Sequence, residues 1–143
     1  MYMLDTNICI YVLKNKPAVV RKRFRVVKHL CISSVTYGEL CFGVENSELH
    51  TRQSRWEQLA DFTQRLIIDA WNEEAARHYG VIRAGLKRSG NMIGNNDMLI
   101  AAHARSTSSV LVTNNTREFA RVPDLTIEDW SGYSDSSTPP MKR

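Results

Sequence analysis

Short apolar runs alternate along the chain with longer stretches in which apolar residues recur every three or four positions. The short runs have the length of buried strands, whereas the longer stretches have the period of amphipathic helices. Strands are predicted over residues 2–4, 30–32, 66–68 and 110–113, with an edge strand over 125–127. Helices are predicted over residues 8–13, from Pro17, after Ser33 or Ser34, over 47–65 and 72–90, and after Asn95 or Asn96.

This alternation indicates βαβ units, because parallel neighbouring strands need a long, usually helical crossover between them. The predicted fold class is α/β, with a central, mainly parallel sheet, helices on both faces and right-handed crossovers. A length of 143 residues suits one domain with one compact core. We place that domain at residues 1–132 and predict a disordered tail at 133–143, which is rich in Ser and Pro.

Three acidic residues stand where predicted strands end or predicted helices begin. Asp5 follows the first strand in MLDTN, Glu39 lies early in a helix in SSVTYGEL, and Asp97 lies in the first turn of a helix in GNNDMLIAAHA. Ligands collect beyond the carboxyl ends of parallel strands, so we expect these side chains to meet there. Polar residues that end other strands at the same edge are Ser33, Asn114 and Asn115. Close carboxylates repel one another unless a hard divalent cation binds, so the sequence predicts a metal site for phosphate chemistry.

Composition narrows the possible functions only slightly. Nineteen Lys and Arg against 15 Asp and Glu give a formal charge of +4, which weakly favours polyanionic partners. The three cysteines form no CxxC pair and lie in apolar stretches, which indicates buried free thiols and a reducing cytoplasm. No apolar run approaches the roughly 20 residues that a membrane span needs, and no signal-peptide pattern opens the chain. A soluble cytoplasmic protein without a membrane partner is predicted.

Four segments, in this order and at these spacings, resemble the PIN domain family. They are LDTN with Asp5, SxVTxxEL with Glu39, GxxDxxIAAHA with Asp97, and VTNNxxEF over residues 112–119. The likeness runs from about residue 2 to residue 130. More narrowly, the chain resembles VapC-type ribonuclease toxins of bacterial type II toxin–antitoxin operons. The resemblance implies a PIN-like three-layer α/β/α sandwich and an endoribonuclease activity.

The resemblance also implies roles for particular residues. Asp5, Glu39 and Asp97 match the acids that bind Mg²⁺ or Mn²⁺ in PIN ribonucleases, and Asn7 matches the polar residue that steadies the first of them. A bound cation lowers the pKa of a water ligand and neutralises charge on the attacked phosphate. No Ser–His or Cys–His arrangement for covalent catalysis is visible in the sequence. Direct hydrolysis is therefore predicted, and the resemblance implies products with 5′-phosphate and 3′-hydroxyl ends.

The chain departs from the family pattern at a fourth site position. Many PIN domains carry a further acid in a T-N-D-like segment after the last buried strand, where this chain has Thr113, Asn114 and Asn115. An amide oxygen can bind a metal or orient a water, but it removes one negative charge. Glu118 is the alternative source of that charge, and an ordinary helix-surface acid is its other interpretation. Whether one or two ions bind stays open.

The resemblance to enteric VapC toxins implies that the substrate is tRNA cut in the anticodon loop, with the initiator tRNA as one candidate. Basic residues near the predicted site could hold RNA phosphates, although each could equally be a solvated surface charge. Such contacts give affinity and little sequence selectivity, so RNA shape must contribute to the choice of substrate. The candidate RNA-binding residues are Lys14, Lys16, Arg83, Lys87, Arg88, Arg117 and Arg121.

The family resemblance implies a VapB-type antitoxin as partner. The tail of such an antitoxin fills a groove beside the acids and often points a basic side chain into the site. We expect this groove at the predicted helical hairpin between Val35 and Phe62, where Tyr37, Phe42 and Trp56 are candidate apolar contacts. A homodimer and larger toxin–antitoxin assemblies are also implied.

Two other classes of function remain open. In phosphatases of the haloacid dehalogenase type the first strand also ends at an Asp, but a second Asp follows two positions later, where this chain has Asn7. The second alternative is a PIN-like RNA-binding or scaffold protein with a weakened site, which the amide at Asn115 suggests. Each acid taken alone could also be a helix cap or a surface charge. His103 is expected to be a buried or partly buried core residue and not a metal ligand.

Overall fold

The computed structural model describes residues 1–131, so the predicted domain end at 132 and the predicted tail at 133–143 lie outside the described residues. The described part holds five strands and seven helices, and each strand overlaps a predicted one. In chain order the elements are β1 (Tyr2–Leu4), α1 (Thr6–Lys14), α2 (Ala18–Val26), β2 (Leu30–Ser33), α3 (Ser34–Glu45), α4 (Leu49–Thr63), β3 (Ile67–Asp69), α5 (Glu73–Ser89), α6 (Asn95–Ser106), β4 (Val110–Val112), α7 (Thr116–Phe119) and β5 (Ile127–Glu128).

The five strands form one sheet in the order β3-β2-β1-β4-β5. All four neighbouring pairs are parallel, and Met3 of β1 lies between Cys31 of β2 and Leu111 of β4. The prediction of a mainly parallel sheet is confirmed. Because every strand runs the same way, the carboxyl ends of all five lie at one edge, where the residues that follow them can meet.

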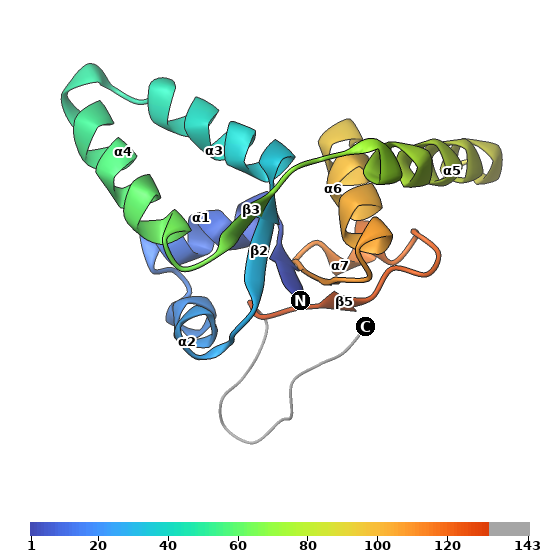
Figure 1. Ribbon diagram of the computed structural model, residues 1–143, viewed down its shortest axis with the longest axis horizontal. Coiled ribbons are helices and arrows are strands. Elements are labelled where there is room, and N and C mark those ends of the chain that lie inside the picture. The colour runs from blue at the N-terminus through green and yellow to red at the C-terminus, as the bar shows by residue number, and fades with distance from the viewer. Residues whose placement is uncertain (132–143) are drawn as a thin grey trace.

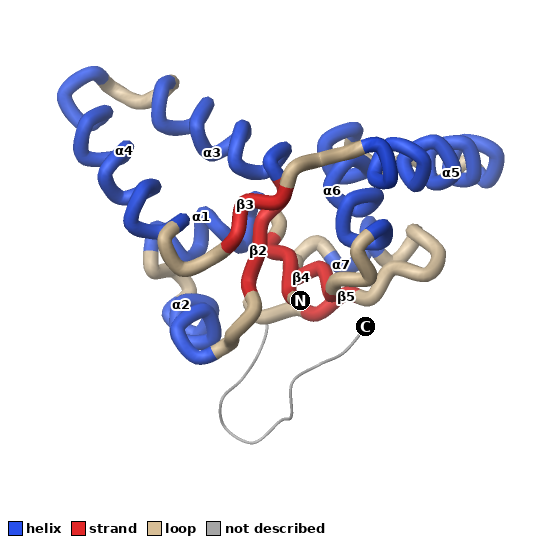
Figure 2. Tube along the Cα trace, viewed as in Figure 1, coloured by secondary structure: helices blue, strands red, loops and turns tan. Residues whose placement is uncertain are grey.

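Side chains that alternate along the central strands separate two hydrophobic cores. Leu4, Ile32 and Val112 belong to the core that α1, α2, α3 and α4 cover. Met3, Cys31 and Leu111 belong to the other core, against α5, α6 and α7. Figures 1 and 2 show the two groups of helices on opposite sides of the sheet. The fold is therefore the expected three-layer α/β/α sandwich.

Two helix starts differ from the prediction. Asp5 caps α1, and its Oδ1 accepts the Ile8 N–H at 2.9 Å, so this helix begins at Thr6 and not at residue 8. Gly94, and not an asparagine, is the residue before α6. The predicted limits of α5 are confirmed, since the Asn72 side chain caps its start and Gly90 ends it at a φ of 72°.

The predicted helical hairpin consists of α3 and α4, which project together from the sheet in Figure 1. Trp56 of α4 donates its indole N–H to the Glu45 carboxylate of α3 at 2.7 Å. Cys9 and Cys31 are buried free thiols as expected, whereas Cys41 is only half-buried. None of the helices described between residues 1 and 131 is long and apolar enough to cross a bilayer.

Candidate metal-dependent nuclease site

Asp5 is the most deeply buried of the three predicted acids, with 4% of its surface exposed. It lies between β1 and α1, where the Ile8 N–H and the Thr113 hydroxyl both hydrogen-bond its carboxylate. Burial raises the pKa of Asp5 to about 6 against the opposing effect of these two hydrogen bonds, and the charges of Asp97 and Glu39 raise it further. Asp5 therefore sits in a site that disfavours its own ionised form.

Glu39 lies in the second turn of α3, and polar side chains from two other helices hold its carboxylate. The Thr6 hydroxyl of α1 donates to Oε1, and the Asn96 side-chain amide of α6 donates to Oε2 at 2.7 Å. Neither Thr6 nor Asn96 was predicted to be part of the site. The sequence could have pointed to them only by their position, because each is the immediate neighbour of a predicted acid.

Asp97 lies half-buried in the first turn of α6, as predicted. Burial raises the pKa of Asp97, and the next contributions come from the charges of Glu118 and then Glu39. Glu118 of α7 is therefore electrostatically coupled to the site. Glu118 is the residue that the sequence offered as the alternative source of the charge missing at Asn115, and its role at the site stays a prediction.

The three predicted acids act on one another electrostatically, and we call them the acidic site (Asp5, Glu39 and Asp97). Within residues 1–131, no group of three or more Asp, Glu, His or Cys side chains is placed so that it could hold a metal ion as it stands. The donor set still fits Mg²⁺ or Mn²⁺, since it consists of carboxylate oxygens. Mg²⁺ keeps several water ligands and takes only one or two protein carboxylates directly, so it does not need a closed cage.

The other predicted polar residues divide between the site and its surroundings. Thr113 is buried and accepts the Asn115 N–H at 2.9 Å as well as holding Asp5. Asn115 precedes α7 and lines a pocket together with Gly94 and Glu118. Asn114 donates its side-chain amide N–H to the Tyr11 hydroxyl of α1 at 2.6 Å.

Asn7 is exposed in the first turn of α1. Among the described residues, the hydrogen bonds that hold the Asp5 carboxylate come from Ile8 and Thr113. The steadying role that the family resemblance implies for Asn7 stays a prediction.

Ser33 does not join the acidic site, although it ends β2 at the expected edge. Its hydroxyl lies 2.8 Å from Nδ1 of His103, and Nε2 of His103 lies 3.4 Å from the Asp69 carboxylate. The expectation that His103 is a core residue is confirmed, since it is 1% exposed. The structure thus contains a Ser–His–Asp arrangement that was not apparent from the sequence. It cannot attack a substrate, because Ser33 is fully buried.

The basic residues predicted to bind RNA are all exposed, and they lie on α1, α5, α7 and the loops that follow α1 and α7. Arg117 lines the pocket that holds Asn115 and Glu118, as does Arg121. Arg83 stands over the Tyr79 ring and donates to its hydroxyl, which in turn donates to the Asn95 side chain at 2.8 Å, two residues before Asp97. The others are exposed, with Lys14 at the end of α1, Lys16 in the loop after it, and Lys87 and Arg88 in the last turn of α5.

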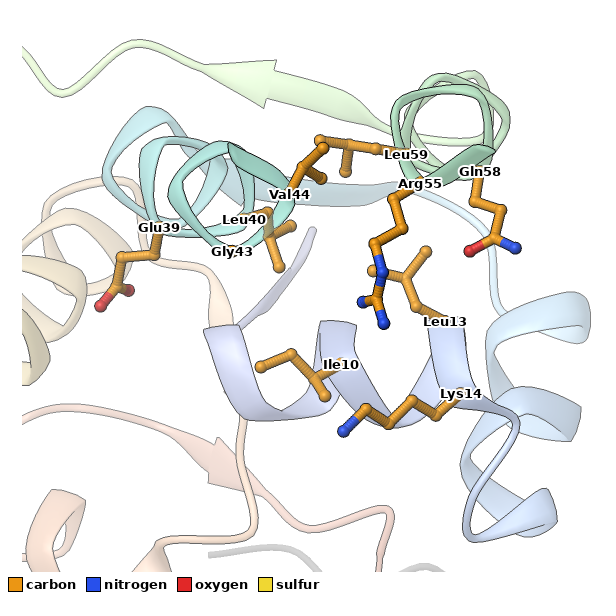
Figure 3. Close-up of a pocket in the computed structure, with 10 residues that line it drawn as sticks. All are labelled: Ile10, Leu13, Lys14, Glu39, Leu40, Gly43, Val44, Arg55, Gln58 and Leu59. Atoms are coloured by element: carbon orange, nitrogen blue, oxygen red, sulfur yellow. The ribbon is translucent and has the colours of Figure 1, made fainter. Parts of the chain in front are cut away.

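A groove between α1, α3 and α4 leads away from Glu39 (Figure 3). Its apolar lining comes from all three helices, and its polar side chains include Glu39, Lys14 and Arg55. Gly43 of α3 leaves part of it open, since a Cβ atom there would meet nothing within 4 Å. The apolar lining residues are Ile10, Leu13, Leu40, Val44 and Leu59.

Comparison with known proteins agrees with this architecture. The PIN domain matches residues 2–125. By fold and by this match, the chain belongs to the PIN domain family.

Its relatives within the family are VapC ribonucleases. The tRNA(fMet)-specific endonuclease VapC of Shigella flexneri is 49% identical over 131 residues, which are 91% of this chain and 98% of that protein. Ribonuclease VapC2 of Haemophilus influenzae is 46% identical over 130 residues, which are 90% of this chain and 97% of that protein. The structure of DNA-bound VapBC from Salmonella typhimurium aligns with a TM-score of 0.85 and 45% identity over 90% of this chain and 97% of that chain.

Proposed function

We propose that this chain is the ribonuclease toxin of a type II toxin–antitoxin module, acting in the cytoplasm. It hydrolyses RNA phosphodiester bonds at the acidic site with the help of a divalent cation. The observation that carries the proposal is that Glu39 of α3 accepts hydrogen bonds from Thr6 and Asn96, the chain neighbours of Asp5 and Asp97. These contacts bring the N-terminal parts of α1, α3 and α6 together at one edge of a parallel sheet. Similarity to two VapC ribonucleases over nearly their full length supports it.

Mg²⁺ or Mn²⁺ is the cation that suits this donor set, and Asp5, Asp97 and Glu39 would hold it. When bound, such an ion activates water and neutralises charge on the attacked phosphate. The chain's own groups fix the carboxylates. The Ile8 N–H and Thr113 orient Asp5, while hydrogen bonds from α1 and α6 keep Glu39 between those two helices.

Glu118 provides the fourth negative charge that the amide at Asn115 lacks. Its charge affects Asp97 more strongly than the charge of Glu39 does. Asn115 lies in the same pocket, where its amide oxygen can accept a hydrogen bond from a metal-bound water. The site therefore has an acidic character close to that of a four-acid PIN domain.

The proposed substrate is tRNA, cut in the anticodon loop. A relative that is 49% identical is named for its specificity toward tRNA(fMet), which makes the initiator tRNA the first substrate to test. Arg117 and Arg83 are the basic residues best placed to hold its backbone. Arg117 lines a pocket with Gly94, three residues before Asp97. Arg83 donates to the Tyr79 hydroxyl, which donates to Asn95, two residues before Asp97. Lys14, Lys16 and Lys87 are more peripheral candidates.

The groove between α1, α3 and α4 is the proposed binding site of a VapB-type antitoxin. Glu39 stands at one end of it, so a peptide lying along its apolar lining could bring a cationic side chain to the acidic site. Tyr37 and Trp56 are half-buried in the hairpin, and Phe42 is 67% exposed. We further propose a homodimer as the unit that the antitoxin binds.

The decisive experiment is incubation of total RNA and purified initiator tRNA with the protein, with Mg²⁺, with Mn²⁺ and with EDTA. We expect metal-dependent cleavage in the anticodon loop that disappears in Asp5→Ala and Asp97→Ala. Asp61→Ala is the matched control, because Asp61 is an exposed acid on α4 away from the acidic site. Cleavage that persists in both site variants would refute the assignment, and intact tRNA beside other cut RNAs would refute the substrate.

The same experiment tests the scaffold alternative, whereas the phosphatase alternative needs a separate assay with small phosphate esters. A scaffold protein would bind RNA and cut none of it under any metal condition. A phosphatase of the haloacid dehalogenase type would release phosphate from small esters and form an aspartyl-phosphate on Asp5, which the buried position and the helix-capping role of this side chain do not favour.

A further inference from the structure

A polar triad (Ser33, His103 and Asp69), of which Ser33 and His103 are buried, has no place in the proposed chemistry. Ser33 and His103 are 0% and 1% exposed, and the Asp69 side chain is 41% exposed. Ser33 ends β2, Asp69 ends the neighbouring β3, and His103 lies in α6. The triad thus connects the sheet edge with the helix that carries Asp97.

The hydrogen-bond partners define how the triad is protonated. The Ser33 hydroxyl accepts the Val35 N–H at 3.1 Å, so its own hydrogen is available for Nδ1 of His103 at 2.8 Å. The remaining ring nitrogen, Nε2, then carries the proton and faces the Asp69 carboxylate at 3.4 Å. Burial lowers the pKa of His103 against the opposing charge of Asp69, which favours this neutral form. Every member of the triad therefore has a partner.

The triad joins the two helices that carry Glu39 and Asp97. Ser33 caps α3, and Glu39 lies six residues further along the chain. His103 lies six residues beyond Asp97 in α6. Six helical residues span about 9 Å, so a tilt of one helix against the other at the triad is transmitted to the carboxylates.

A second pair of hydrogen bonds fastens the same two helices from the segment after β3. The Trp71 backbone N–H donates to the Ser34 hydroxyl of α3 at 3.0 Å. The Trp71 indole N–H donates to the Leu99 carbonyl of α6 at 2.9 Å. At the other end of the interface, Asn96 of α6 donates to Glu39 of α3. The packing of α3 against α6 is thus specified by directional contacts at both ends.

An apolar side chain at position 103 would avoid the desolvation of an imidazole, but it would leave the buried Ser33 hydroxyl without its acceptor. A fully satisfied polar network instead fixes one relative orientation of the elements it joins. We propose that His103 is a positioning residue, which holds α3 and α6 at the separation at which Glu39 and Asp97 share one divalent cation with Asp5. This inference rests on the proposed function, because it assumes a cation at the acidic site.

The test compares His103→Leu, which removes both hydrogen bonds, with His103→Asn, whose Oδ1 can replace Nδ1 as the acceptor for Ser33. Ile100→Ala is the matched control, since Ile100 is 1% exposed in the same helix and its loss creates a cavity without touching the triad. Four quantities are measured on each full-length variant: Mn²⁺ affinity by calorimetry, kcat and KM for tRNA, and stability to urea in EDTA.

We expect His103→Leu to weaken Mn²⁺ binding about 10-fold and to lower kcat with KM for tRNA unchanged, as removal of groups that orient metal ligands does. His103→Asn should recover part of the Mn²⁺ affinity. Ile100→Ala should lose stability and keep wild-type Mn²⁺ affinity. Wild-type Mn²⁺ affinity in His103→Leu would overturn the inference, as would equal losses of affinity in His103→Leu and Ile100→Ala.

Two further variants keep the test decidable. If His103→Leu does not fold, Asp69→Ala removes the outer member of the triad without opening a deep cavity, and the same weakening of Mn²⁺ binding is expected. Asp97→Ala tests the metal site itself. Unchanged Mn²⁺ binding in Asp97→Ala would contradict the proposed function, whereas lost binding there with full binding in His103→Leu would contradict only the role of His103.

Discussion

Replacing Asp5 by Asn should make the metal-free protein more stable and should abolish the proposed ribonuclease activity. Asp5 is almost fully buried, and burial together with Asp97 and Glu39 raises its pKa from 3.8 to about 6. An Asn side chain keeps an acceptor for the Ile8 N–H, so the cap of α1 is preserved. It removes the buried charge that the neighbouring acids repel.

The pKa change gives the size and the sign of the effect. A carboxyl whose pKa is higher in the folded state contributes full stability below pH 3.8, and this stability is lost as the pH rises through about 6. The interval between the two pKa values corresponds to about 3 kcal/mol. The Asp5→Asn variant has no carboxyl group at this position, so its stability should not fall over this pH range. Its advantage should approach about 3 kcal/mol above pH 7 and fall to roughly half of that near pH 5.

Urea unfolding followed by tryptophan fluorescence in EDTA, from pH 5 to pH 8, measures this difference. Asp61→Asn is the control, since it removes an exposed acid of α4 and should leave the pH dependence unchanged. Mn²⁺ at 1,000 times its Kd should reverse the order, because it stabilises wild type by about 4.1 kcal/mol and should not bind the variant. An Asp5→Asn variant without an advantage at pH 8, or with one that does not shrink as the pH falls, would refute the reasoning.

Three further predictions concern the fourth charge, the antitoxin groove and a buried ion pair. Asn115→Asp should tighten Mn²⁺ binding in calorimetry and lower the metal-free unfolding free energy, because it adds a carboxylate beside Glu118. Gly43→Leu should weaken binding of the cognate VapB-type antitoxin and leave RNA cleavage intact, since the new side chain enters the open groove; wild-type antitoxin affinity would contradict the groove assignment. Arg23→Ala should lower the unfolding free energy by about 2–4 kcal/mol in thermal unfolding, because it leaves the 5%-exposed Glu128 side chain without its ion-pair partner at 3.0 Å.

The parts of this fold that could be predicted from sequence are those that local patterns determine. The strand at Val110–Val112 and the helix from Asn72 to Gly90 were predictable because a β-branched run, a capping side chain and a left-handed glycine each act over a few residues. The edge position of the acids followed from the βαβ alternation. The particular family was predictable because four motifs occur in one order.

The contacts that complete the site could not be predicted in this way, because they join residues far apart in the chain. The hydrogen bond from Asn96 to Glu39 spans 57 positions, and that between Ser33 and His103 spans 70. No periodicity records such pairings, since each side chain alone is compatible with a cap or a core position. The same limitation explains why Ser33 was expected at the acidic edge and is instead buried behind it.

This chain has an amide at position 115, where many PIN domains have an acid, and an acid at position 118. The geometry of a helix start explains how the second position can replace the first. Asn115 is the residue before α7, and Glu118 is the third residue of that helix. Both side chains line the same pocket, so a charge at either position reaches the same region of space. The effect of Glu118 on Asp97 agrees with this geometry. A chain with an amide after its last buried strand can therefore keep the charge of a four-acid site, provided that an acid follows three residues later.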